Sequence, residues 1–201
     1  QPLFVAALLP PFRIFQNYFA AMAHHDESGV IGRRPSKEQP GEAQADPYDL
    51  CRRFCEPQRT DFHKALSEIR NGRKQTCWSW YVFPTPPWVV DGVERGSGTN
   101  QHYALRDKPP NDLQGYDAAR AYLRLESDGV SLRNNFVSIT SEVAEQLECG
   151  ISCSRLMGCL DDPKLRSSLK LFEVVSRDGF DDEVNRTCRR ALAAMDEPLQ
   201  N

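Results

Sequence analysis

Two short basic motifs, far apart in the chain, have the residue types that hold an anion. The first is Arg73-Lys74, which follows the helix stop signal Asn71-Gly72, and the second runs from Lys164 to Ser168 after Asp162-Pro163. Cationic side chains, hydroxyls and the free backbone N–H groups at a helix start are the partners that phosphate needs. Tryptophans nearby can stack on a planar ring. The pattern predicts one anion-binding pocket, lined by Arg73, Lys74, Trp78, Trp80, Lys164, Arg166, Ser167 and Ser168.

A purely structural interpretation of the same residues stays open. In it, Arg73 and Arg166 form ion pairs with acids such as Glu68 and Asp162. The tryptophans, among them Trp88, then fill the core, as large aromatic side chains commonly do. The two interpretations differ in whether both basic motifs face one cavity.

Other reactive side chains have no identifiable catalytic partner. His63 lies on the wetter side of a predicted helix, and His102 lies in a Gly-rich loop. Cys77 follows Arg73-Lys74, where the pKa of a thiol can be lowered, although a packed thiol is the commoner outcome. The sequence contains no nucleophile, metal-ligand or phosphate-loop motif of recognised spacing. We therefore expect no metal and no cofactor; catalytic residues, and whether the protein is an enzyme, stay open.

The cysteine pattern favours reduced thiols. The chain has seven cysteines, so at least one is unpaired. Two pairs have C-x3-C spacing, Cys51/Cys55 and Cys149/Cys153, which places both sulfurs on one face of a helix. Zinc prefers a shorter C-x2-C spacing or histidine partners. We interpret the cysteines as mostly buried thiols, with a structural disulfide or a metal site as the alternatives.

The overall charge argues against nucleic acid and anionic membrane surfaces as partners. The net charge is −3, whereas both of those partners require a broad excess of Lys and Arg. Residues 49–74 differ, since they hold seven basic and four acidic side chains, a local excess of three positive charges. We expect an anionic small molecule as ligand.

Residues 1–45 differ in composition from the rest of the chain. Residues 1–23 are apolar, but Pro10-Pro11 interrupts a run that is already shorter than the roughly 20 residues of a membrane span. We interpret them as a leader, namely a presequence, a signal remnant or an upstream translated segment. Residues 24–45 are nearly free of apolar side chains, which is typical of a flexible linker. No membrane span is predicted, and the expected location is cytoplasmic, with mitochondria as the alternative.

Apolar spacing predicts a helical domain over residues 46–201. Stripes at helical spacing cover 60–70, 117–125, 132–147, 163–174 and 184–195. Thr60, Asp117 and Asp162 are the predicted N-caps, and Pro163 then stands at the first helical position. The aromatic run that ends at Pro84 fits a helix or a strand.

The segment 84–111 is rich in Pro and Gly, which is typical of a long surface loop. The predicted fold is therefore all-α, a compact multihelical single domain with one long Pro/Gly-rich surface loop.

The order and spacing of two motifs resemble a known family. The first motif is Glu68-Ile69-Arg70-x-Gly72-Arg73-Lys74 followed by Trp78-x-Trp80-Tyr81-Val82-Phe83-Pro84, and the second is Asp162-x-Lys164-Leu165-Arg166-Ser167-Ser168-Leu169. From about residue 46 to 180, the chain is similar to a small, multihelical, largely bacterial domain of unknown function that is sometimes labelled calpastatin-like. The resemblance implies an all-helical fold and no established activity. Calpain inhibition does not follow, because calpain-inhibitor repeats are disordered and this sequence is periodic.

Departures from the pattern of that family, including Pro57 where the family tends to have Ala and one extra residue near Cys51, leave two hypotheses for the function of the chain. The family usually has His before the first Trp and Gln after the Pro, where this chain has Cys77 and Thr85. Because both basic motifs are retained, the first hypothesis is a domain that binds an anionic, nucleotide-like small molecule between them. Loss of the His and Gln favours the second, a non-catalytic accessory subunit or interaction domain of a larger assembly, for example a mitochondrial one. Its protein partners would contact the leader and the 84–111 loop.

Overall fold

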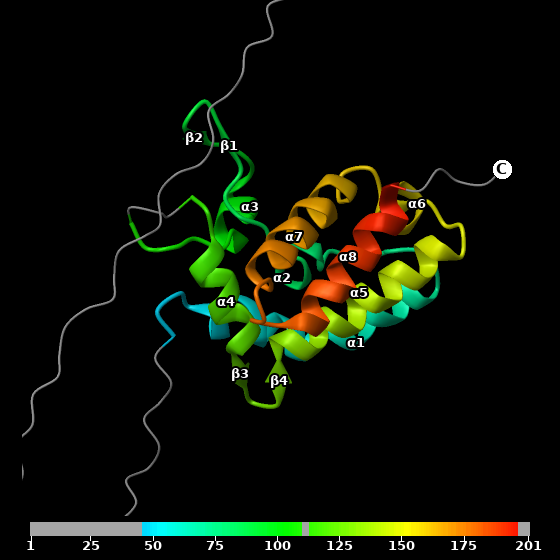
Figure 1. The fold of residues 1–201 in the computed structure, drawn as a ribbon, viewed down its shortest axis with the longest axis horizontal. Helices are drawn as coiled ribbons and strands as arrows, with labels where there is room; N and C mark the ends of the chain where they lie inside the picture. Colours follow the sequence, from blue (N-terminus) through cyan, green and yellow to red (C-terminus); the bar gives the residue numbers. More distant parts are fainter. Residues whose placement is uncertain (1–45, 110–112, 197–201) are drawn as a thin grey trace, which may run out of the picture. The chain divides into compact units, whose positions relative to one another are not determined.

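The computed structural model describes residues 46–109 and 113–196, and this part of the chain is mainly helical (Figure 1). The all-α prediction is confirmed. The interpretation of residues 1–45 as leader and linker lies outside the described residues. In chain order the elements are η1 (a π-helical turn, Cys51–Cys55), α1 (Glu56–Arg70), α2 (Ser79–Val82), β1 (Val89–Val90), β2 (Val93–Glu94), α3 (Gly98–Tyr103), α4 (Tyr116–Arg124), β3 (Glu126–Ser127), β4 (Val130–Ser131), α5 (Leu132–Glu148), α6 (Cys153–Met157), α7 (Asp162–Val175) and α8 (Asp182–Asp196).

Four long helices pack side by side in the order α1, α5, α8, α7 (Figure 1). Helix α5 contacts both α1 and α8, and α4 contacts both α5 and α7. Each long helix turns its apolar stripe inward, so that Ile69, Ile139, Leu169 and Val184 are all buried. Burial of these stripes drives the packing, at about 25 cal/mol per Å² of apolar surface. Among the described residues, no helix has both the length and the apolar composition to cross a membrane.

A chain of aromatic rings runs through the centre of the core. Phe136 and Phe172 lie 4.3 Å apart between ring centroids, and Phe83 lies 6.0 Å from Phe136. Trp78 extends the series at 6.2 Å from Phe83. These tilted and edge-on contacts add to the apolar burial. One tryptophan of the signature motif is thus a core residue.

Helix α1 begins earlier than predicted and ends where predicted. Thr60 is not an N-cap, because η1 continues directly into α1 and Thr60 lies inside the helix. Pro57 is the second residue of α1, just after the π-helical turn. At the other end, Gly72 has φ +75° and donates to the carbonyl of Ile69 at 2.8 Å. Glycine accommodates this left-handed conformation at little cost.

Two further helix starts differ from the prediction. Asp162 is the first residue of α7 and not its N-cap; Asp161 precedes the helix, and its carboxylate binds lysines instead of the helix N–H groups. Asp117 lies inside the first turn of α4. The carboxylate that caps α4 belongs to Asp107, which accepts from the N–H groups of Tyr116 and Ala118, each at 2.8 Å.

The segment predicted as a long loop, 84–111, contains regular structure of its own. Strands β1 and β2 form an antiparallel hairpin around Asp91-Gly92, both at positive φ. Asp-Gly favours such a two-residue turn. Helix α3 follows, with Ser97 accepting from Asn100 N–H at 3.3 Å as its N-cap. The N–H of Leu105 then donates to the carbonyl of Thr85 at 2.8 Å, which ties the two ends of the segment together.

Candidate functional site

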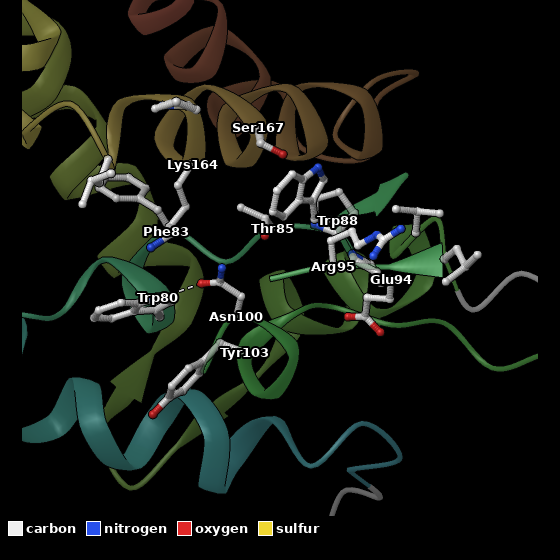
Figure 2. Close-up of a pocket in the computed structure, with 16 residues that line it drawn as sticks. Trp80, Phe83, Thr85, Trp88, Glu94, Arg95, Asn100, Tyr103, Lys164 and Ser167 are labelled. Atoms are coloured by element: carbon white, nitrogen blue, oxygen red, sulfur yellow. Dashed lines mark hydrogen bonds between the residues drawn. The ribbon is translucent and has the colours of Figure 1, made fainter. Parts of the chain in front are cut away.

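A pocket of about 890 Å³ lies where α2, the 85–103 segment and the first turns of α7 come together (Figure 2). Its walls are mostly aromatic and apolar. The polar groups are few and come from separate elements, which is usual for a small-molecule site. The aromatic lining residues are Trp80, Phe83, Trp88 and Tyr103, and the polar ones are Thr85, Glu94, Arg95, Asn100, Lys164 and Ser167.

One end of the pocket is formed by Trp80 and Lys164. The indole N–H of Trp80 donates to Asn100 Oδ1 at 2.8 Å, which sets the orientation of the ring. The Nζ of Lys164 lies 4.2 Å from the centroid of that ring, a distance at which a cation is attracted to an indole face. This end is therefore preorganised by contacts within the protein.

The two basic motifs of the sequence meet at Asp161. Its Oδ1 lies 2.9 Å from the Nζ of Lys164, and its Oδ2 lies 2.7 Å from the Nζ of Lys74. Burial alone raises the pKa of Asp161, but the hydrogen bonds from Lys74 and Lys164 outweigh it and lower that pKa. One carboxylate thus serves two ammonium groups, and the cluster keeps one net positive charge at the edge of the pocket.

The other end of the pocket is formed by Trp88 and Arg95, which flank the β1–β2 hairpin. The N–H of Arg95 donates to the carbonyl of Trp88 at 2.7 Å, so the hairpin holds the two residues together. The Trp88 side chain is 60% exposed. Arg95 forms no ion pair with any residue of 46–109 or 113–196. Glu94 beside it is paired with Arg106.

The polar lining consists mainly of hydrogen-bond donors. The Asn100 amide uses its oxygen for Trp80, which leaves its two N–H groups to face a ligand. Within the described residues, the hydroxyls of Thr85 and Ser167 have no hydrogen-bond partner. Since a carboxylate or phosphate ligand is an acceptor, such a lining suits an anion better than a cation.

Only some of the eight residues predicted from the sequence line this pocket. Trp80, Lys164 and Ser167 do, and Lys74 is linked to them through Asp161. The other four lie elsewhere: Arg73 is exposed after Gly72, Arg166 pairs with Asp196 at 2.6 Å, and Trp78 and Ser168 are buried in the core. Those four therefore do not form one concave surface with Lys164, and the pocket has a different boundary from the predicted one.

The structural interpretation was right about Trp78 but named the wrong acid partners. Glu68 binds no arginine of the described residues; its carboxylate accepts from Gln75 N–H, Thr76 N–H, the Thr76 hydroxyl and the Trp78 indole, at 2.6–3.0 Å. Both the N–H and the hydroxyl of Thr76 are thus engaged by Glu68. Burial alone raises the pKa of Glu68, but these hydrogen bonds outweigh it and lower that pKa from 4.5 to about 2. We name Glu68, Thr76 and Trp78 the Glu68 cluster.

Several lining residues were missed by the sequence interpretation. Arg95, Asn100 and Tyr103 come from the segment predicted as a long Pro/Gly-rich surface loop. A local signal was present, because Asp91-Gly92 between valines is a strong hairpin pattern. The position of α3 had no local signal. It depends on Arg53, whose guanidinium donates to the carbonyls of His102 and Ala104 at 2.9 and 2.6 Å.

The cysteines and histidines form no second site. All seven cysteines are free, as expected, but only Cys55 and Cys188 are buried and Cys77, Cys149 and Cys159 are exposed, so the expectation that most are buried is wrong. Burial raises the pKa of the Cys55 and Cys153 thiols to about 12, which makes them poor nucleophiles at neutral pH. Within the described ranges, no group of three His, Cys, Asp or Glu side chains is placed to hold a metal ion.

Comparisons with known proteins agree with the fold, and the proteins they identify have no activity in their descriptions. A crystal structure of the conserved hypothetical protein Rv1873 from Mycobacterium tuberculosis is similar, with 27% sequence identity and a TM-score of 0.57. The match covers 74% of this chain and 87% of that one. No curated protein matches. Neither the family description nor the description of that structure mentions calpastatin, so nothing supports that label. Residues 47–195 match one family model, and the chain therefore belongs to the family described as protein of unknown function (DUF1810).

Proposed function

We propose that this domain binds a small planar molecule with an anionic group, of the nucleotide-like class, in the pocket between α7 and the 80–103 segment. The observation that carries the proposal is the composition of the pocket. Indole faces and unpaired hydrogen-bond donors line one cavity, and its carboxylate, that of Glu94, is engaged by Arg106. Arg73 and Arg166 have no part in this version of the site.

The aromatic groups supply the contact with the planar part of the ligand. Trp88 is the more available of the two indoles, because 60% of its side chain is exposed. Stacking of a base on an aromatic side chain contributes about 1–3 kcal/mol and tolerates different bases. The lining therefore favours planar heterocycles as a class over any single base.

The cationic groups supply the contact with the anion. Lys164 shares Asp161 with Lys74, so a ligand oxygen that approaches Lys164 meets a cluster of net positive charge. A hydrogen bond to a charged group contributes about 1.5–3 kcal/mol. Loss of one such contact thus corresponds to roughly ten-fold or more in affinity.

The test is a titration of the protein with a panel of nucleoside monophosphates and diphosphates by calorimetry. The informative variant is Lys164→Met, and its matched control is Lys170→Met, an exposed lysine on the same helix that does not line the pocket. We expect Lys164→Met to weaken binding about ten-fold and Lys170→Met to leave the affinity unchanged, with both melting temperatures close to the wild type. Equal losses in both variants, or no binding by the whole panel, would overturn the proposal.

A second candidate function is favoured by the mouth of the pocket. Leu160 is 92% exposed and lies there with Trp88 and Leu113, so part of the rim is apolar and faces solvent. Exposed apolar groups that gather at one place mark interaction surfaces. An interaction domain that docks a protein partner through this rim is the function to examine if the nucleotide panel gives no binding. In that case Leu160→Ser and Trp88→Ser should abolish association with a partner while the domain stays folded.

A further inference from the structure

We propose that the pocket consists of two half-sites and takes a two-ended ligand of the dinucleotide class, in which each half is planar and anionic. This inference rests on the proposed function. Each half-site combines one indole with one cation. The first half-site contains Trp80 and Lys164, and the second contains Trp88 and Arg95. Figure 2 shows these two pairs toward opposite ends of the pocket, with Thr85 and Asn100 between them.

The two half-sites are built by independent parts of the chain. In the first, Trp80 comes from α2 and Lys164 from α7, and the cation lies 4.2 Å from the ring centroid. In the second, both residues flank one hairpin, and the hydrogen bond from Arg95 N–H to Trp88 O keeps them adjacent. The first pair is a cation–π contact and the second is held adjacent by a backbone hydrogen bond, so unrelated local structures bring an indole and a cation together twice in one cavity.

The size of the pocket agrees with a ligand that occupies both ends. Small-molecule pockets have volumes of about 300–1,000 Å³, and this one, at about 890 Å³, is near the upper limit. A ligand that filled the first half-site alone would leave Trp88 exposed and Arg95 without a partner in the described residues. Occupation of both half-sites covers the indole and gives the guanidinium an anion to bind.

The half-sites differ in how their cations are held before a ligand binds. Lys164 already has Asp161 and the face of Trp80 as partners, so a ligand competes with existing contacts. Arg95 has no such competitor among the described residues, and its planar guanidinium can hold a phosphate by two parallel hydrogen bonds. We therefore expect the second half-site to contribute the larger share of the salt-dependent affinity.

Connecting two groups that bind neighbouring half-sites raises affinity, because the second group binds at a high effective concentration. The experiment compares adenosine monophosphate with diadenosine diphosphate by calorimetry, on the full chain. We expect the wild type to bind the dinucleotide at least about ten-fold more tightly. In a Trp88→Ala, Arg95→Gln double variant, the affinity for the dinucleotide should fall to that for the mononucleotide.

A control separates damage to the half-site from damage to the fold. Arg189 is exposed on α8 and does not line the pocket, so Arg189→Gln should leave both affinities unchanged. The double variant should still bind the mononucleotide through the intact first half-site, and it should bind the dinucleotide no more tightly than the mononucleotide. That result, with an unchanged melting temperature, attributes the loss to the second half-site.

The outcomes distinguish this inference from the proposed function on which it rests. Equal affinities of the wild type for the two nucleotides would overturn the two-half-site inference and leave the proposed function standing. A dinucleotide preference that survives in the double variant would also overturn it. Absence of binding by either nucleotide would overturn both proposals.

Discussion

The Glu68 cluster and one wall of the pocket come from the same stretch of sequence, residues 68–83. The two regions differ in whether their polar groups have hydrogen-bond partners within the protein. Trp78 is 1% exposed, and its indole N–H is held by a carboxylate that three further donors also engage. Trp80, two residues later, lines an open cavity in which Thr85 and Ser167 have no partner among the described residues. Buried polar groups that have hydrogen-bond partners within the protein stabilise its fold, whereas donors without such partners around a cavity can bind a ligand.

This comparison explains why a rare sequence motif need not lie in a binding site as a whole. The segment from Glu68 to Phe83 contributes to both regions. Glu68 and Trp78 hydrogen-bond to each other in the Glu68 cluster, whereas Trp80 and Phe83 line the pocket. The position where the resembling family has Gln, Thr85, also lines the pocket. This position therefore belongs to the pocket and not to the Glu68 cluster.

The largest effect is expected from removal of the carboxylate of the Glu68 cluster. Glu68→Ala leaves the indole of Trp78 and the N–H groups of Gln75 and Thr76 without their acceptor. Because the buried indole N–H, left unsatisfied, costs about 1–3 kcal/mol and the part-buried N–H groups of Gln75 and Thr76 add a smaller cost, we expect the free energy of unfolding to fall by about 3 kcal/mol. Urea denaturation measures this loss. Glu68→Gln, which keeps one carbonyl acceptor, should recover part of it.

A similar magnitude is expected from acid. The pKa of Glu68 is lowered from 4.5 to about 2 in the folded state, so the folded protein binds this proton less readily than the unfolded chain does. The stabilisation is therefore complete above about pH 4.5 and is lost as the pH falls toward about 2, and it amounts to about 3 kcal/mol.

Denaturation curves at a series of pH values test the role of this carboxylate. Asp161 and Asp181 also have lowered pKa values, so the wild type loses stability in acid through several groups. Glu68→Gln should have a shallower dependence on pH below about 4.5. An unchanged slope in that variant would show that Glu68 does not supply this part of the acid sensitivity.

An intermediate loss of stability is expected at the frame of the pocket, by which we mean the contact between the start of α4 and the end of the 85–105 segment. A Cβ on Gly115 would lie 2.4 Å from the carbonyl oxygen of Leu105, whereas a Cβ on Gly92 would meet nothing within 4 Å. Both glycines have a positive φ, +72° and +73°. Gly92→Ala should therefore cost about 1–2 kcal/mol through backbone conformation alone, and Gly115→Ala clearly more.

Thermal unfolding of the two alanine variants checks this difference. Because their φ angles are matched, the excess loss in Gly115→Ala measures the close approach of the α4 start to the end of the 85–105 segment. Equal losses would mean that the segment moves away at little cost, and that the frame of the pocket is less rigid than the Glu68 cluster.

The smallest effect on stability is expected inside the pocket. Trp80→Phe removes one hydrogen bond, that to Asn100, and should lower the free energy of unfolding by about 1 kcal/mol. Trp78→Phe, the matched substitution in the Glu68 cluster, should cost more, because it leaves a buried carboxylate with one donor fewer. Urea denaturation of both variants sharpens the comparison. A greater loss for Trp80→Phe would contradict the division into structural cluster and ligand site.

Much of the helical framework could be read from local patterns. The stripes of α5 and α7 predicted their helices within a few residues, and Ser131, where the α5 stripe starts, accepts from Asn134 N–H as N-cap. Gly72 ends α1 as the Asn-Gly pattern indicated. Two hairpins, at Asp91-Gly92 and Asp128-Gly129, have equally local signals that the helical interpretation passed over.

Tertiary structure decided the partners of the charged and polar side chains. Asp107 caps a helix that begins nine residues later in the sequence. Asp161 contacts both Lys164, close to it in the sequence, and Lys74, which is far from it in the sequence. The spacing of residues in the sequence cannot predict such contacts. Several aspartates could serve as the partner, and only the packing of the helices decides which one lies within hydrogen-bond distance.

The sequence by itself determined the fold class and the presence of basic and aromatic groups near two helix ends, since periodicity and helix-stop signals act over a few residues. Only the tertiary structure decided that Trp78 is core and Trp80 is pocket, and that Arg166 pairs with Asp196 while Arg95 faces the cavity. The physical reason is that burial and ion pairing depend on what the neighbouring elements bring to a side chain, and those neighbours are distant in sequence.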